Sequence, residues 1–275
     1  LGLAIGLAHN GFLPIPEIQF LAYVHNAEDQ IRGEAATLSF FSDRQYCNPM
    51  VIRIAGLGYQ KGFGGHFHND NSLAFLREIP GVVVACPSNG ADAARMLREC
   101  YRLAHEQKRV VMFVEPIALY MTKDLHEKGD NGWLSVYPAD DSRVTLGDIA
   151  VYGDDNPELV ILTYGNGYYL SRQAEEIVRK QHNKKVRVVD LRWLTPLPMS
   201  KVLDAVKDIE NILVVDECRK TGSLSEELIT RLMEESEQSH KIRRVCGRDT
   251  FIPIGKSWEF VLPAKEDIVD AIINF

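Results

Sequence analysis

The chain has 275 residues, of which 45% are hydrophobic and 25% charged, and its net charge is −7. This composition is typical of a globular protein with an apolar core, large enough for one large domain or two ordinary ones. The negative charge argues against broad binding of nucleic acid or anionic membranes, and no apolar run reaches the ~18–20 residues of a membrane span. The five cysteines are scattered and form no CxxC pair, which predicts reduced thiols.

Helical and strand patterns alternate along the first part of the chain. A stretch rich in glycine and alanine predicts a tightly packed helix that ends at Gly11, and Asn89 or Ser88 is expected to cap the longest helix. Continuous apolar runs such as PMVIRIA predict strands that are buried on both faces. The predicted strands are 14–20, 49–55, 81–88 and 110–116, and the predicted helices are 2–11, 27–41, 72–80 and 89–107.

A polar, turn-rich stretch at residues 117–146 predicts a linker or a long surface excursion. Beyond it the alternation resumes, with predicted strands 158–165, 185–194, 211–218 and 241–247 and predicted helices 166–181, 198–209, 223–236 and 265–274. Repeated strand–helix units imply parallel sheets covered by helices. We therefore predict an α/β fold of two consecutive domains, residues 1–140 and 141–275.

The segment KGFGGHFHND, residues 61–70, concentrates chemically active side chains. His66 and His68 are two residues apart, so in an extended segment they would point to one side, and Asp70 would continue that face. A metal site would need further ligands, and the sequence shows no HExxH or other ligand-spaced partner. A phosphate loop would need a Lys-Ser/Thr pair or a GxGxxG turn. A histidine beside glycines can approach a ligand closely and titrate near neutral pH, so a catalytic role stays open beside a metal site and a plain loop.

Polar and aromatic residues also mark two predicted strands. Glu17 and Gln19 belong to the first strand, and Tyr23 follows one helical turn later. Taken alone, these three residues indicate a strand end with one buried tyrosine. The Arg192–Trp193 pair in a later strand indicates packing.

Several blocks follow one another in a fixed order along nearly the whole chain. They are GLAIGLAHNGFLPIPEIQF, DQIRGEAA, HNDNSLAFLREIPGVVVACPSNGADAARMLREC, FVEPIALY, LTYGNG, VVDLRWLTPLP and VVDECRKTGS. Each block alone is a modest signal, whereas their collinear order is a strong one. In this order the chain resembles the beta subunit of the thiamine diphosphate-dependent 2-oxo acid dehydrogenases. This is the decarboxylating first component of the pyruvate and branched-chain complexes, within the transketolase-like superfamily.

The resemblance implies an architecture and a set of partners. A transketolase-like pyrimidine-binding domain, incomplete at its N-terminus, would precede a transketolase C-terminal domain. The cofactor would lie between two chains, with its diphosphate and Mg²⁺ held by an alpha subunit or the alpha half of a fused chain through a Gly-Asp-Gly motif. The stretch GDDN at 153–156 is a poor match to that motif, so no metal ligand is expected in this chain. A lipoyl-bearing acyltransferase component would be the other partner.

The resemblance also implies site residues. Gln19 and Tyr23 match positions that contact the aminopyrimidine, where Tyr23 would stack, and Glu17 beside them is a third cofactor-binding candidate. His68 matches the family histidine near the thiazolium, which moves protons in the acyl intermediate and in transfer to a lipoyl arm. His66 is a second catalytic candidate on the same face.

Three departures from the family pattern matter. Asn69 and Asp70 stand where the family often has Ser-Gln, and both are expected on the substrate side. The family glutamate would fall shortly before Leu1, and the chain starts inside a helical pattern without an initiator Met, so we expect a further N-terminal segment. Cys100 matches one position of a structural K⁺ site, yet the following stretch lacks the Asp and Asn, so K⁺ is not predicted.

The resemblance therefore implies oxidative decarboxylation of a 2-oxo acid, either pyruvate or a branched-chain acid, with acyl transfer to a lipoyl domain. The expected compartment is the bacterial cytoplasm or the mitochondrial matrix. Two alternatives stay open: a transketolase-superfamily enzyme that acts on sugar phosphates, and a non-catalytic scaffold fragment.

Overall fold

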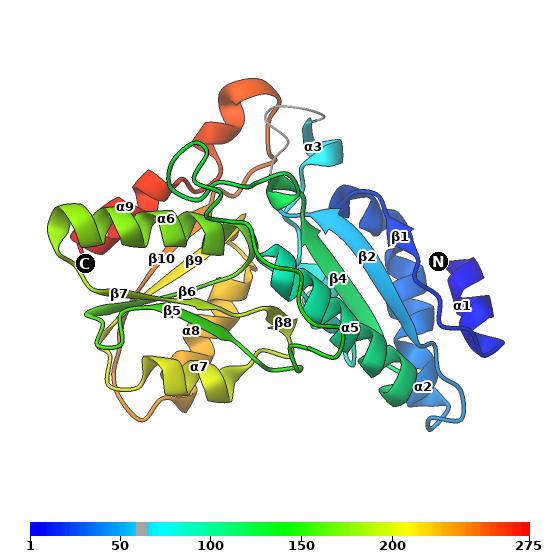
Figure 1. The fold of residues 1–275 in the computed structure, drawn as a ribbon. Helices are drawn as coiled ribbons and strands as arrows, with labels where there is room; N and C mark the ends of the chain where they lie inside the picture. Colours follow the sequence, from blue (N-terminus) through cyan, green and yellow to red (C-terminus); the bar gives the residue numbers. More distant parts are fainter. Residues whose placement is uncertain (59–64) are drawn as a thin grey trace.

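The computed structural model describes residues 1–58 and 65–275, and within these ranges the strands form two five-stranded sheets (Figure 1). Most of the predicted glycine-rich loop, residues 61–64, lies outside the described residues. The N-terminal sheet has the order β1 (Glu17–Ile18), β2 (Met50–Gly56), β4 (Val110–Pro116), β3 (Val83–Ala85) and β8 (Trp193–Thr195). Its neighbours are parallel except for β3 and β8, which run antiparallel.

Strands β2 and β4 pair in the interior of this sheet. Successive residues of each strand point to opposite faces of the sheet, and both faces are apolar. Val51 and Val111 pack with the long helix α5 (Gly90–Gln107), whereas Ile52 and Met112 belong to the core on the opposite face. The prediction of buried strands here is confirmed. The opposite face is covered by η1 (Leu21–Ala27) and η2 (Gln30–Ala35), and the remaining helices of this half are α1 (Gly2–His9), α2 (Thr37–Phe41), α3 (Gly65–His68), α4 (Ala74–Glu78) and η3 (Ile117–Leu119).

The C-terminal sheet has the order β10 (Lys241–Gly247), β9 (Asn211–Arg219), β6 (Leu159–Thr163), β7 (Val186–Asp190) and β5 (Ala150–Gly153). Every residue of β6 is buried, as expected for a parallel strand covered on both faces. One face carries α6 (Gly165–His182) and α9 (Lys265–Ile273), and the other carries α7 (Met199–Val206) and α8 (Leu224–Glu235) (Figure 1). A 3₁₀ turn, η4 (Gly255–Phe260), precedes α9.

Two predicted elements differ in the structure. The prediction of a single amphipathic helix over 27–41 is wrong. Residues 30–35 form a π-helix, which ends in the backbone hydrogen bond from Ala36 N to Ile31 O (2.9 Å). Gly33 lies within this stretch, where glycine disfavours a regular α-helix. Strand β5 was not predicted, since its four residues form a largely exposed antiparallel edge and give no apolar run.

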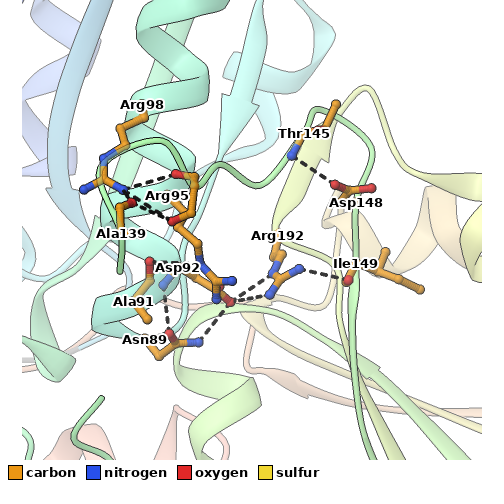
Figure 2. A network of polar contacts seen from close by, with 11 residues as sticks. Asn89, Ala91, Asp92, Arg95, Arg98, Ala139, Thr145, Asp148, Ile149 and Arg192 are labelled. Carbon is orange, nitrogen blue, oxygen red and sulfur yellow. Dashed lines mark hydrogen bonds and ion pairs between the residues drawn. The ribbon is translucent and has the colours of Figure 1, made fainter. Parts of the chain in front are cut away.

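The strand predicted over 185–194 is two strands in different sheets. After β7 the chain turns at Arg192, whose φ is +60°, and Trp193 then pairs with Ala85 of β3 in the N-terminal sheet. Arg192 is not a simple packing residue. Its Nε and Nη2 donate to Asp92 of α5 at 2.9 and 2.6 Å, and both side chains are buried (Figure 2).

Asp92, the partner of Arg192, lies in the first turn of helix α5. The Asn89 side chain accepts a hydrogen bond from Asp92 N at 2.9 Å, which confirms the predicted cap and fixes the first turn of the helix. Arg95 donates to the second oxygen of Asp92 at 2.6 Å (Figure 2). The Asp92 carboxylate therefore joins the two sheets while remaining fully hydrogen-bonded.

Candidate functional site

The candidate site lies where the carboxyl ends of β1 and β2 meet the helical segment η1. Gly56 at the end of β2 permits this approach, because a Cβ there would lie 2.8 Å from the Leu21 Cβ. The short helix α3 packs against η1. This arrangement brings residues 17–23 close to the histidine segment although about forty residues separate them in the sequence.

His68 lies against two aromatic side chains of this region. Its Nε2 is 3.5 Å from the Tyr23 hydroxyl, and its ring is edge-on to Phe20 at a centroid distance of 4.6 Å. Phe20 and Tyr23 are themselves edge-on at 5.7 Å. The structure thus brings together two residues that the sequence assigned to one site. It adds Phe20, whose position between Gln19 and Tyr23 was the signal in the sequence that could have revealed it.

His66 does not share this face, so the prediction that both histidines point to one side is wrong. Residues 65–68 form a helical turn rather than an extended segment, and residues two apart in a helix point in nearly opposite directions. His66 is exposed and lies 5.9 Å from the Phe251 ring of the C-terminal half.

Glu17 in β1 and Gln19 just after it are both exposed. Glu17 lies 3.2 Å from Arg53 Nη1, and Arg53 also binds Glu115 through its Nε at 2.6 Å. These carboxylates, with Glu115 first, raise the pKa of Arg53, and burial together with the hydrogen bond to Glu115 raises the pKa of Tyr120. Glu17 therefore has an ion-pair partner inside the chain, while its contact with a cofactor stays a prediction.

Asn69 and Asp70 are both buried. The Asn69 amide donates to Gly65 O at 3.2 Å and closes the turn of α3. The Asp70 carboxylate accepts a hydrogen bond from Ser72 and lies 3.5 Å from both His25 and Arg219. The structure gives both side chains partners within the protein, and their predicted substrate role stays untested.

Strand β9 carries a buried carboxyl group, that of Glu217, which the sequence did not single out. Burial raises the pKa of Glu217 to about 8, with a smaller contribution from Asp216, and a hydrogen bond with Asn166 opposes the shift. In the described part of the chain its Oε1 has no hydrogen-bond partner. The Asn71 amide donates to the backbone carbonyl of Glu217 at 2.7 Å, which ties this strand end to the histidine segment.

The donor set suits one end of thiamine diphosphate. An aminopyrimidine is a flat ring with both donor and acceptor atoms, and the exposed Gln19 amide can supply both, while the partly exposed Tyr23 and Phe20 offer ring surfaces. Within residues 1–58 and 65–275, no group of three or more His, Cys, Asp or Glu side chains is placed to hold a metal ion. None of the helices in the same ranges is both long and apolar enough to cross a membrane. All five cysteines are free thiols.

Comparisons with known proteins define the class. The family model described as transketolase, pyrimidine binding domain matches residues 1–122, and the one described as transketolase, C-terminal domain matches residues 148–268. A solved structure titled "Split gene transketolase, inactive beta4 tetramer" matches with a TM-score of 0.73 at 19% identity, over 99% of this chain and 79% of that one. The predicted fold of two transketolase-type domains is confirmed.

Curated relatives narrow the class. The 2-oxoisovalerate dehydrogenase subunit beta of Pseudomonas aeruginosa is 30% identical over 271 residues, which cover 94% of this chain and 73% of the relative. The mitochondrial 2-oxoisovalerate dehydrogenase subunit beta of Dictyostelium discoideum is 29% identical over 256 residues, which cover 92% of this chain and 65% of the relative. The chain belongs to the family of beta subunits of the 2-oxo acid dehydrogenases, with the domains of the transketolase superfamily.

Proposed function

We propose that this chain is the pyrimidine-binding, beta-type part of a thiamine diphosphate-dependent 2-oxo acid dehydrogenase. It would work with an alpha subunit or alpha half and pass the acyl group to a lipoyl-bearing acyltransferase. The observation that carries the proposal is the contact between His68 and Tyr23, 3.5 Å apart, at the end of β1 and β2 in a chain of this family. The bacterial cytoplasm and the mitochondrial matrix are the proposed compartments.

The aromatic face would hold the aminopyrimidine. Tyr23 would stack on the ring, Gln19 would hydrogen-bond to its edge, and Glu17 is the third candidate contact. The bound cofactor supplies the nucleophilic carbon and the electron sink for decarboxylation, and Mg²⁺ would be held with the diphosphate mainly by the alpha part.

His68 would hold and move a proton at its Nε2. An imidazole can donate and accept a proton near neutral pH, which acyl transfer requires in both directions. The Tyr23 hydroxyl at 3.5 Å and the edge-on Phe20 ring limit the orientations that the imidazole can take. A fixed orientation favours proton transfer because the reacting atoms start in line. His66 faces Phe251 instead, so it is the weaker catalytic candidate.

The test uses the full-length gene product assembled with its alpha part. Isothermal titration measures binding of thiamine diphosphate with Mg²⁺, and turnover is measured on a panel of pyruvate, branched-chain 2-oxo acids and sugar phosphates. We expect cofactor binding and decarboxylation of at least one 2-oxo acid. If thiamine diphosphate binds and only sugar phosphates are turned over, the chain would instead be part of a transketolase-type enzyme. If thiamine diphosphate does not bind, the non-catalytic scaffold would be the remaining hypothesis.

The role of His68 is tested in a separate experiment with variants. His68→Ala should lower acyl transfer to a lipoyl domain by about 10²–10⁴-fold, the usual contribution of general acid–base catalysis. His66→Ala tests the second candidate and should transfer acyl groups at close to the wild-type rate if His68 alone moves the proton. Normal lipoyl acylation by His68→Ala would refute the assignment and leave the cofactor chemistry intact.

A further inference from the structure

The segment that follows His68 is fastened to the C-terminal half of the chain. Asn71 binds the carbonyl of Glu217 at the end of β9, and Ser72 accepts a hydrogen bond from Arg219 Nη1 at 2.6 Å. Gly65, at the start of α3, packs closely on Ile254, since a Cβ there would lie 2.9 Å from the Ile254 Cγ1. Residues on both sides of His68 therefore contact residues more than 140 positions further along the chain.

Arg219 is the hub of these contacts. Its guanidinium reaches Ser72 through Nη1, Asp70 Oδ1 at 3.5 Å through Nη2, and the carbonyl of Thr250 at 3.2 Å through Nε. The same guanidinium lies 5.7 Å from the centre of the Phe251 ring. A guanidinium spreads its donors over three nitrogens in one rigid plane, so it can reach partners on several segments at once, whereas a lysine has its three donors on a single nitrogen.

Asp70 joins this hub to the aromatic face. Its Oδ1 accepts the Ser72 hydroxyl at 2.7 Å, and its Oδ2 lies 3.5 Å from His25 Nε2. His25 belongs to η1, the same segment that carries Tyr23. One carboxylate therefore bridges η1, the histidine segment and β9, and the side chain is 9% exposed, so solvent screens these contacts weakly.

We propose that Arg219 and Asp70 are positioning residues that hold His68 against Tyr23 and Phe20. The role of His68 in this statement rests on the proposed function. Asp70 then acts between protein segments rather than on the substrate, because its Oδ1 accepts the Ser72 hydroxyl and its Oδ2 lies against His25.

The first readout is independent of catalysis. Amide hydrogen exchange is measured by mass spectrometry on the assembled full-length enzyme, for wild type, Arg219→Met and Asp70→Asn. Losing a hydrogen bond to a charged group should speed exchange in residues 65–73 about tenfold, while helix α5 exchanges as in wild type. Arg231→Met is the matched control, because Arg231 pairs with Glu235 within α8. Unchanged exchange in both Arg219→Met and Asp70→Asn would overturn the proposal.

The second readout separates positioning from substrate binding. Both variants should lower kcat for lipoyl acylation about tenfold, while KM for the 2-oxo acid and the Kd of thiamine diphosphate stay within about twofold of wild type. Arg219→Lys, which keeps the charge without the fork, should fall between wild type and Arg219→Met. A rise in KM with unchanged kcat in Asp70→Asn would overturn the proposal and return Asp70 to the substrate. If the wild-type assembly turns over no 2-oxo acid, the proposed function fails, and the exchange data alone decide the positioning role.

Discussion

Replacing Glu217 by glutamine should remove a loss of stability that the wild-type chain undergoes as the pH rises from about 4.5 to about 8. The carboxyl group is buried, and its pKa is raised from an ordinary value of 4.5 to about 8. Between these two values the folded chain holds a proton that the unfolded chain has released. Stability therefore falls as the pH rises through this interval. Glutamine keeps nearly the same shape and has no proton to lose, so the variant lacks this dependence.

The magnitude follows from the same two pKa values. Each pH unit between about 5 and 8 should lower the unfolding free energy of wild type relative to Glu217→Gln by ~1.4 kcal/mol. Over the whole interval the unfolding free energy of wild type relative to Glu217→Gln falls by ~5 kcal/mol at most. Local opening that lets water reach the carboxyl group would reduce this value. Asp190, whose pKa burial raises to about 7, titrates in both proteins, so its contribution cancels in the difference.

Urea unfolding at half-unit steps from about pH 5.5 to 7.5 gives the difference directly. Glu234→Gln, at an exposed position of α8, is the matched control and should follow the wild-type pH profile. A difference between wild type and Glu217→Gln that stays constant within ~0.5 kcal/mol across this range would show that Glu217 is ionised in the folded chain, which would refute the reasoning.

Three further outcomes are expected. Asp92→Ala should lower the unfolding free energy by about 3–5 kcal/mol in urea, because it leaves the buried Arg192 guanidinium without its carboxylate; a loss below ~1 kcal/mol would contradict this. Gly56→Ala should cost about 1–3 kcal/mol in thermal unfolding, since its Cβ would meet Leu21 at 2.8 Å, and an unchanged Tm would show that η1 moves freely away. Tyr23→Phe should bind thiamine diphosphate within about threefold of wild type and Tyr23→Ala at least about tenfold more weakly, as titration calorimetry would measure; equal affinities of the two variants would argue against ring stacking.

Local patterns were enough to predict much of the fold. The strand predicted from the apolar run PMVIRIA and the helix cap at Asn89 depend only on residues close together in the sequence, and the structure has both at the predicted positions. The edge strand β5 and the π-helix at 30–35 have no such pattern, because the first is exposed and the second is an alternative winding of a helical stretch. Whether the domains divide at residue 140 stays a prediction.

The site could be predicted where the family resemblance supplied residue pairs. His68 and Tyr23 were assigned to one site from matched motifs, and the structure places them in contact. The partners of Asp70 could not be predicted, since Arg219 lies 149 residues further along the chain and only the folded chain brings them together. The opposite directions of His66 and His68 follow from a single helical turn, which the glycines before it conceal in the sequence.

Strand β8 has a practical consequence for dissecting this molecule. It comes from the second half of the sequence and completes the first sheet by pairing with β3. A polypeptide that stops near residue 140 would leave β3 as an open edge, with the apolar side chains Val83 and Val84 uncovered beside unsatisfied backbone groups. Such edges recruit strands from other chains. The pyrimidine-binding half should therefore aggregate when produced alone and become soluble when residues 193–195 are supplied with the rest of the chain.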